Sequence, residues 1–423
     1  MDADVTPHYL SSVWTHLTRT PMVHGSGCWL TDVHGERWLD LTSGIGVLNT
    51  GHCHPKVVAA IRDQANQLVF SQINCGVPLV TSALSERLHE ITPASINRFF
   101  LANSGAEATE AAIKLAKHAT GRPNVVVLQG SFHGRTHLAM AMTTSKKVYR
   151  QGYQPLPAGI FVTPFPDPRL FEGDEDRAVG WATCQFSDLL ASQTDPSETA
   201  AFIVEPVLGE GGYKRVPTAF LRAVREICRT HGILFIADEV QSGFGRTGTL
   251  FCFEQADIDP DVIVMAKGLG SGMPISAVGA SDDLMQRWIP GTHGGTYGGG
   301  NALAMASARA TIDVIVEEHL CDRARQMGAY LVSALQHRTG EHPGVAEVRG
   351  LGLMVAIEFE AANGMTATAK AAAVQQALLQ ARILVLTCGT YGHVLRLIPP
   401  LIVTQEELDL ALEVIVHALE SIH

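Results

Sequence analysis

The sequence of 423 residues has little positive charge, with 31 lysines and arginines against 42 aspartates and glutamates. Its formal net charge of −11 argues against nucleic acid or an anionic membrane as the main partner. No apolar run approaches the roughly 20 residues of a transmembrane helix. The opening residues, MDADVTPHYL, lack the apolar region of a secretory signal. These absences predict a cytoplasmic protein without a membrane partner.

Cysteine pairs are also absent, because the eight cysteines are scattered and form no C-x-x-C motif. The spacing favours free thiols in a reducing cytoplasm, and we expect these thiols to lie in the core. The pattern G-x-x-x-x-G-K-[ST] does not occur, which removes the phosphate loop that an ATPase would need beside Asp238 and Glu239. What remains is an ordinary composition, 46% hydrophobic and 17% charged, in a chain long enough for two or three domains.

Two short apolar runs stand out because each ends at a polar side chain. Residues 233–237 stop at Asp238, and residues 262–266 stop at Lys267, which glycines follow. Such runs are typical of buried parallel strands. Ligands of open α/β sheets bind just beyond the carboxyl ends of these strands. We therefore expect a carboxylate and an amine in one crevice.

An aspartate and a lysine placed in this way suit pyridoxal 5′-phosphate (PLP). The lysine would hold the cofactor as a Schiff base, and the carboxylate would keep the pyridine nitrogen protonated. A strand-end aspartate also commonly caps a turn, and most lysines are surface charges. The two residues alone leave both interpretations open.

Strands and helices alternate along the middle of the chain. Residues 98–102, 124–128 and 201–205 are predicted as further strands, and residues 218–230 as a helix between strands. This alternation predicts a parallel sheet covered by helices, the α/β class.

A helix is predicted to begin after Ser104, which forms an S-x-x-E capping box with Glu107. Because Gly105 allows close approach, the first N–H groups of this helix can bind a phosphate. The same pattern is typical of a plain capped helix.

The two ends of the chain predict a smaller α+β unit. Residues 1–24 are compatible with a helix, and GCWLTDVHGERWLDL predicts a hairpin. After Asn301, an Ala-rich helix precedes strands predicted at 352–358, 383–386 and 394–398 and a final helix starting at Thr404. We predict an N-terminal segment over residues 1–50 that packs with a small domain over 306–423, and a large cofactor-binding domain over 51–305.

Two other patterns point to different chemistry. Gly243, Gly245 and Gly248 satisfy G-x-G-x-x-G, but no long amphipathic helix opens at the third glycine. His133 and His137 have a helical metal-binding spacing but lack a nearby third ligand, so we predict no metal site.

Six motifs in order, SGAEATEAAIKLAK, SFHGRT, EPVLGEGG, FIADEVQSGFGRTG, AKGLGSGMP and GGTYGGGNALA, resemble those of class III (subgroup II) PLP-dependent aminotransferases. The resemblance covers nearly the whole chain. It implies PLP-dependent transferase fold type I, with a mostly parallel seven-stranded sheet in the large domain and a smaller α+β domain. It also implies a homodimer, or a dimer of dimers, with shared active sites.

The resemblance also implies residue roles. Lys267 would form the Schiff base and shuttle a proton, Asp238 would pair with the pyridine nitrogen, and Glu205 would support the ring. The other implied cofactor positions are Ser104, Gly105 and Ala106 at the phosphate, Phe132, His133 and Val240 at the ring, Gln241 at the ring hydroxyl, and Thr296 at the neighbouring subunit's phosphate.

Within the family, the pattern is most similar to 4-aminobutyrate aminotransferases, which move an amino group from an ω-amino acid to 2-oxoglutarate by a ping-pong mechanism. The implied substrate positions are Ile45 above the substrate, Arg135 at a distal carboxylate, and Glu210 with Arg396. The alternatives are an acetylornithine- or ornithine-type aminotransferase and another class III ω-aminotransferase that uses pyruvate. Two departures from the family pattern are Leu208 in place of Gln, and an extra glycine in TYGGGNALA, where the usual Pro after Asn is also missing.

Two rival functions come from other classes. One is an NAD enzyme of the Rossmann type that uses the GFGRTG loop, and the other is an inactive homologue that serves as a dimeric binding protein. The visible absorbance of a protein-bound cofactor would distinguish all three.

Overall fold

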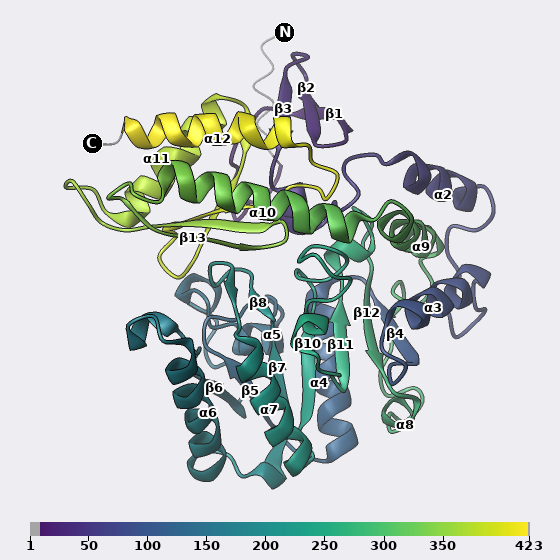
Figure 1. Ribbon diagram of the computed structural model, residues 1–423. Helices are drawn as coiled ribbons and strands as arrows, with labels where there is room; N and C mark the ends of the chain where they lie inside the picture. Colours follow the sequence, from purple (N-terminus) through teal and green to yellow (C-terminus); the bar gives the residue numbers. More distant parts are fainter. Residues whose placement is uncertain (1–8, 422–423) are drawn as a thin grey trace.

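The computed structural model describes residues 9–421, and a seven-stranded sheet lies at its centre (Figure 1). In this sheet β12 runs antiparallel to both of its neighbours, and the other pairings are parallel. The mostly parallel α/β sheet is therefore confirmed. Its spatial order is β4 (Arg98–Ala102), β12 (Ser276–Ala280), β11 (Val262–Met265), β10 (Leu234–Asp238), β7 (Thr199–Val204), β5 (Asn124–Leu128) and β6 (Ile160–Thr163).

Two of these strands, β6 and β12, are not among those that the sequence predicts. The text of β12, SAVGA, consists mainly of small residues with low strand propensity, so its pattern does not stand out. It is buried throughout because it lies between β11 and β4. Its neighbours in the sheet, rather than its own residues, give this segment its strand conformation.

Alternate residues of the strands face two separate cores. Val126 and Phe202 pack in the core that contains α6 and α7. Val127 and Ile203 pack in the core beneath α4 and α5. Helices on both faces bury the inner strands β5, β7, β10 and β11 almost completely, which explains why these strands are continuous apolar runs. These helices are α4 (Gly105–Thr120), α5 (His137–Met142), α6 (Glu175–Ser192) and α7 (Thr218–His231).

The N-terminal hairpin is confirmed as the antiparallel pair of β2 and β3, and β3 also pairs in parallel with β15 (Ile383–Leu384). It lies at the same end of the molecule as the last helix (Figure 1), and Trp29 Nε1 donates a 2.6 Å hydrogen bond to Glu407 Oε1 of that helix. The elements of this region are β1 (Met22–Ser26), β2 (Trp29–Asp32), β3 (Arg37–Asp40), α1 (Ser43–Gly46), α2 (Pro55–Ala65) and α3 (Leu79–Ile91).

The helix expected within residues 1–24 is wrong for the part that the structure describes. Residues 9–21 form turns and irregular structure, and a strand begins at Met22. Pro21 disfavours a helical conformation at Thr20, which opposes a helix reaching this point. Residues 1–8 lie outside the described residues.

The C-terminal part contains the expected Ala-rich helix and the final helix, whose capping box joins Thr404 and Glu407. The strand expected at 383–386 is corrected to two strands, because the chain passes from β15 in one sheet to β16 in another. The elements are α8 (Asp282–Met285), α9 (Ala302–Glu317), α10 (Leu320–Thr339), β13 (Val345–Leu351), β14 (Met354–Phe359), α11 (Ala367–Gln380), β16 (Leu386–Cys388), β17 (Val394–Leu397) and α12 (Gln405–Glu420).

Short elements connect the larger ones. They are β8 (Val207–Leu208), β9 (Lys214–Arg215) and the 3-10 turns η1 (Lys147–Tyr149), η2 (Pro168–Phe171), η3 (Pro196–Glu198), η4 (Cys252–Ala256) and η5 (Lys267–Leu269). Among residues 9–421, no helix is long and apolar enough to cross a membrane.

All eight cysteines lie within the described residues and are free thiols, as expected. The expectation that they lie in the core is wrong for Cys53, Cys75 and Cys184, which are exposed.

Candidate active site

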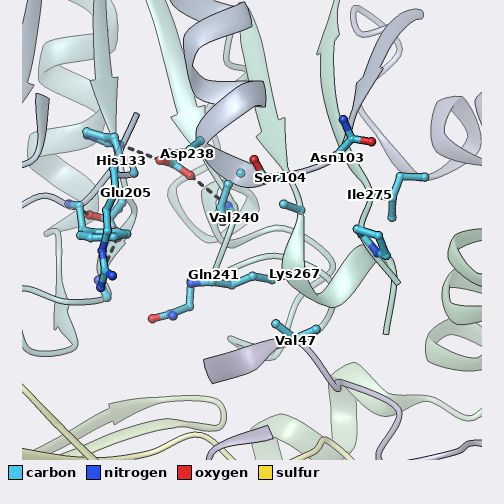
Figure 2. A pocket seen from close by; sticks show the side chains of 18 of the residues that line it. Val47, Asn103, Ser104, His133, Glu205, Asp238, Val240, Gln241, Lys267 and Ile275 are labelled. Carbon is cyan, nitrogen blue, oxygen red and sulfur yellow. Dashed lines mark hydrogen bonds and ion pairs between the residues drawn. The ribbon is translucent and has the colours of Figure 1, made fainter. Parts of the chain in front are cut away.

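A cavity of about 460 Å³ opens beyond the carboxyl ends of β7, β10 and β11. Figure 2 shows residues that line it, with His133 and Glu205 near one end of the view and Ile275 near the other. Most of the residues singled out from the sequence meet here. They are Ser104, Gly105, Ala106, Phe132, His133, Arg135, Glu205, Glu210, Asp238, Val240, Gln241 and Lys267.

Asp238 is the last residue of β10, and its carboxylate is held on both oxygens. His133 Nδ1 lies 2.7 Å from Oδ2, and the Val240 N–H donates a 3.1 Å hydrogen bond to Oδ1 (Figure 2). An ionised carboxylate can only accept, so Nδ1 of His133 donates. Asp238 is 3% exposed. This buried, oriented anion is suited to face a cation in the cavity.

The pairing of His133 with Asp238 was not foreseen from the sequence, which placed His133 beside the cofactor ring. The only available signal was its position in SFHGRT. The two residues are 105 positions apart, and the fold brings them together.

Lys267 begins the turn η5 just after β11 and lines the same cavity. Burial lowers the pKa of its amine to about 8, although Glu210 opposes this shift. Its backbone has φ +43°, in the left-handed region that non-glycine residues rarely adopt. Such strain is often found at functional positions.

The start of α4 forms one wall of the cavity. Ser104 Oγ accepts from the Glu107 N–H at 3.3 Å, and the Ser104 N–H donates to Glu107 Oε2 at 3.2 Å, which completes the expected capping box. A Cβ atom on Gly105 would lie 2.9 Å from Val240 Cγ1, so only glycine fits there. The helix start therefore offers N–H groups and a positive dipole end to an anion.

Glu205 and Gln241 complete the polar lining. Glu205 accepts hydrogen bonds from the Phe132 N–H at 2.7 Å and the Gly209 N–H at 3.0 Å, while burial raises its pKa to about 7. Gln241 Nε2 donates to the Ile45 carbonyl at 3.4 Å, but its buried Oε1 has no partner among the described residues. That oxygen can accept a hydrogen bond from a hydroxyl group of a bound molecule.

Glu210 and Arg396 form an ion pair at the cavity. Arg396 Nη1 of β17 donates a 2.5 Å hydrogen bond to Glu210 Oε1, and the Arg396 side chain is 4% exposed. Burial alone would raise the pKa of Glu210, but Arg396 and Lys146 outweigh it and keep the pKa below its ordinary value. The guanidinium of Arg135 stacks over the Tyr149 ring, with Cζ 4.9 Å from the ring centroid.

Three predicted site residues do not line the cavity in this chain, and one of them, Arg396, reaches it only through its partner Glu210. Ile45 is 40% exposed, and Val47 lines the cavity instead. Thr296 is exposed and lies outside the cavity lining. Asn103, Met273 and Ile275 line the cavity without having been singled out from the sequence.

A buried aspartate, a strand-end lysine and a helix start suited to an anion lie around one cavity, and this set of groups fits PLP. The orphaned Oε1 of Gln241 also suits the ring hydroxyl. The model of the family "Aminotransferase class-III" matches residues 10–419. The chain belongs to this family, and its cofactor is PLP.

Relatives with different substrates match at similar levels. The 5-aminovalerate aminotransferase of Pseudomonas putida is 39% identical over 91% of this chain and 89% of its own. The acetylornithine aminotransferase of Methanothermobacter thermautotrophicus is 38% identical over 96% and 95%. The 4-aminobutyrate aminotransferase of Escherichia coli is 37% identical over 92% and 90%. The chain is an aminotransferase acting on small molecules.

Among solved structures, the chain is similar to an amine transaminase from an uncultivated Pseudomonas species in a PLP-bound form. That structure has a TM-score of 0.90 and 28% identity, and the match covers 98% of each chain.

Proposed function

We propose that this aminotransferase moves an amino group from an ω-amino acid such as 4-aminobutyrate to 2-oxoglutarate by a ping-pong mechanism. The observation that carries the proposal is the Glu210–Arg396 ion pair at the cavity that also contains Lys267. The 5-aminovalerate and 4-aminobutyrate aminotransferases among the relatives support it.

Bound PLP supplies an electron sink that makes loss of a proton from the substrate carbon feasible. In this proposal, Lys267 Nζ would hold the cofactor and would also move the proton at the substrate carbon. Its lowered pKa, about 8, suits an amine that must accept and return a proton. Asp238, whose carboxylate His133 orients, would keep the pyridine nitrogen protonated.

The remaining cavity residues hold and orient the cofactor. The start of α4 at Ser104, Gly105 and Ala106 would hold the phosphate, and Gln241 Oε1 would accept a hydrogen bond from the ring hydroxyl. Phe132 and Val240 would hold the ring between them. Glu205 fixes the Phe132 backbone through its 2.7 Å hydrogen bond, which keeps that wall in place.

The ion pair addresses the need to bind two different substrates in turn. An ω-amine has no carboxylate on its reacting carbon, whereas glutamate has one. A buried arginine reserved for that carboxylate would lie unpaired in the amine half-reaction, at a cost of several kcal/mol. Glu210 pairs with Arg396 when the amine is bound. When glutamate or 2-oxoglutarate is bound, Glu210 releases Arg396, and Arg396 then binds the α-carboxylate bidentately. Arg135 binds the distal carboxylate of both substrates.

Acetylornithine is the second candidate donor, because its reacting carbon also lacks a carboxylate and an acetylornithine aminotransferase is 38% identical. The two candidates differ at the far end of the substrate, where acetylornithine carries a bulkier group. Half-reaction kinetics with 4-aminobutyrate, 5-aminovalerate and acetylornithine as donors, and with 2-oxoglutarate and pyruvate as acceptors, would rank them.

Variants test this alternation of Glu210 between a paired and a released state, which we call the switch. Arg396→Ala should impair the 2-oxoglutarate half-reaction much more than the 4-aminobutyrate half-reaction, whereas Arg135→Ala should impair both. Single-turnover absorbance changes of the bound cofactor measure each half separately. Equal damage to both halves by Arg396→Ala would refute the switch.

We further propose a homodimer, in which Thr296 contacts the phosphate of the neighbouring subunit, and a large domain over residues 51–305. All seven strands of the central sheet fall within that range, which supports the proposed boundary.

A further inference from the structure

Tyr149 is a half-buried residue of η1 that does not itself line the cavity. It contacts Arg135 and also Glu210, the partner of Arg396. Its hydroxyl donates a 2.9 Å hydrogen bond to Glu210 Oε2. Its ring lies under the Arg135 guanidinium, 4.9 Å from ring centroid to Cζ, and meets the Phe132 ring edge-on at 5.2 Å.

The two oxygens of Glu210 have different partners. Oε1 accepts from Arg396, whereas Oε2 accepts from Tyr149 and lies 3.8 Å from Lys146 Nζ. A rotation that takes Oε1 away from Arg396 therefore need not break the contact at Oε2. The carboxylate would keep one hydrogen bond and one cation after releasing its main partner.

These contacts matter because Glu210 has little access to water. Its side chain is 12% exposed, so a released and unpartnered carboxylate would be strongly disfavoured. Burial and the charge of Glu210 raise the pKa of Tyr149 to about 12, so the hydroxyl keeps its proton and remains a donor at physiological pH.

We propose that Tyr149 is a positioning and specificity-determining residue that holds Glu210 through Oε2 when Arg396 is released, with Lys146 as its cationic neighbour. This inference rests on the proposed alternation of Glu210 between the two half-reactions. Tyr149 thereby favours the state that accepts an α-carboxylate. Its ring also fixes Arg135, so one side chain links the two substrate-binding arginines.

Tyr149→Phe removes the hydroxyl and keeps the ring under Arg135, which separates the two contacts. Loss of a hydrogen bond to a charged group should lower kcat/KM of the 2-oxoglutarate half-reaction by about ten- to a hundredfold. The 4-aminobutyrate half-reaction, in which Arg396 still neutralises Glu210, should change by less than about threefold. The matched control is Tyr153→Phe, an exposed tyrosine of the same loop, which should leave both halves unchanged.

A double variant tests whether Tyr149→Phe acts on the 2-oxoglutarate half-reaction through Glu210. In Glu210→Ala there is no carboxylate to hold, so adding Tyr149→Phe should cause no further loss in the 2-oxoglutarate half-reaction. Calorimetric binding of glutarate, a dicarboxylate without an amino group, provides a readout without turnover and should weaken in Tyr149→Phe but not in Tyr153→Phe.

Equal losses in both halves, no loss in either, or a further loss in the Glu210→Ala background would overturn the role of Tyr149. If Arg396→Ala still distinguishes the two halves, the proposed function survives that outcome. If Arg396→Ala damages both halves equally, the switch itself fails, whatever Tyr149→Phe shows.

Discussion

Asp238 and His133 lie 105 positions apart in the sequence, and their contact illustrates how single residues acquire their properties in this site. Both are buried, and each would be costly to leave without a partner. The histidine satisfies the carboxylate on one side, and the Val240 N–H satisfies it on the other. The aspartate thus stays oriented before any cofactor binds.

Replacing Asp238 by Asn tests its charge. Asn keeps an oxygen that accepts from His133 but cannot stabilise a protonated pyridine nitrogen. We expect Asp238→Asn to retain PLP and to lose turnover by several powers of ten, each corresponding to about 1.4 kcal/mol of barrier. Steady-state rates and cofactor absorbance measure the two effects. A loss smaller than about tenfold would mean that another group protonates the ring.

The amine of Lys267 gives a pH dependence. Burial lowers its pKa from 10.5 to about 8, so half of the amine is neutral and reactive near pH 8, and the neutral fraction levels off above that pH. We expect the rate at which cofactor-free protein regains PLP absorbance to follow this profile. A rate still climbing steeply near pH 10 would contradict it.

Lys267→Ala should show no covalent attachment and no transamination, with the fold retained.

Residues of the four-stranded sheet β13-β14-β17-β16 and of the turn after β16 hydrogen-bond to the loop that carries Glu210. Arg349 of β13 donates to the Gly212 carbonyl through Nε at 3.0 Å and Nη2 at 2.6 Å. The Gly389 N–H donates to the Glu210 carbonyl at 3.0 Å. Glu358 of β14 lies 2.7 Å from Arg349 and also binds Arg169 of η2. The sheet that contains β13 and β14 thereby helps to position Glu210, which lines the cavity at the edge of the seven-stranded sheet.

We expect Arg349→Met to destabilise this junction. The variant loses both hydrogen bonds to Gly212 and leaves the buried Glu358 with fewer cations, and hydrogen bonds to charged groups contribute about 1.5–3 kcal/mol each. The Tm should fall clearly in differential scanning calorimetry of the PLP-loaded protein. Arg177→Met removes an exposed arginine that lies 4.0 Å from Glu172 and should leave the Tm unchanged. Equal Tm values for the two variants would show that the junction contributes no stability.

On the scale of the whole molecule, large apolar side chains are exposed in residues 68–79 and beside Thr296. Leu68, Val69, Val77 and Leu79 are exposed, as is Tyr297, whose ring contacts Phe70 at 5.3 Å between centroids. Exposed apolar surface commonly marks protein interfaces. These side chains support the proposed homodimer, in which Thr296 would have its partner across the interface.

Light scattering should therefore find a dimer for the wild-type protein. Leu79→Glu replaces the exposed Leu79 by a charged residue and should shift the protein towards monomer, with loss of bound PLP. Leu170→Glu, at an exposed leucine of η2, is the matched control and should remain dimeric. A monodisperse wild-type monomer with full activity would refute shared active sites.

The sequence by itself determined the features that depend on neighbouring residues. The apolar runs that end at Asp238 and Lys267, the capping boxes at Ser104 and Thr404, and the alternation of strands with helices are all local patterns. They predicted the class of sheet, the edge of the sheet at which the cavity lies and, with the family resemblance, the cofactor.

Only the tertiary structure decided which distant groups became partners. The family resemblance implied Glu210 with Arg396, and the two residues do pair. No pattern in the sequence indicated that His133 pairs with Asp238, 105 positions away, or that Tyr149 reaches Glu210 across 61 positions. Likewise, β12 and the divided strand at 383–388 take their places from their neighbours in the sheets. Charge pairing and burial depend on which segments meet in space, and no local pattern carries that information.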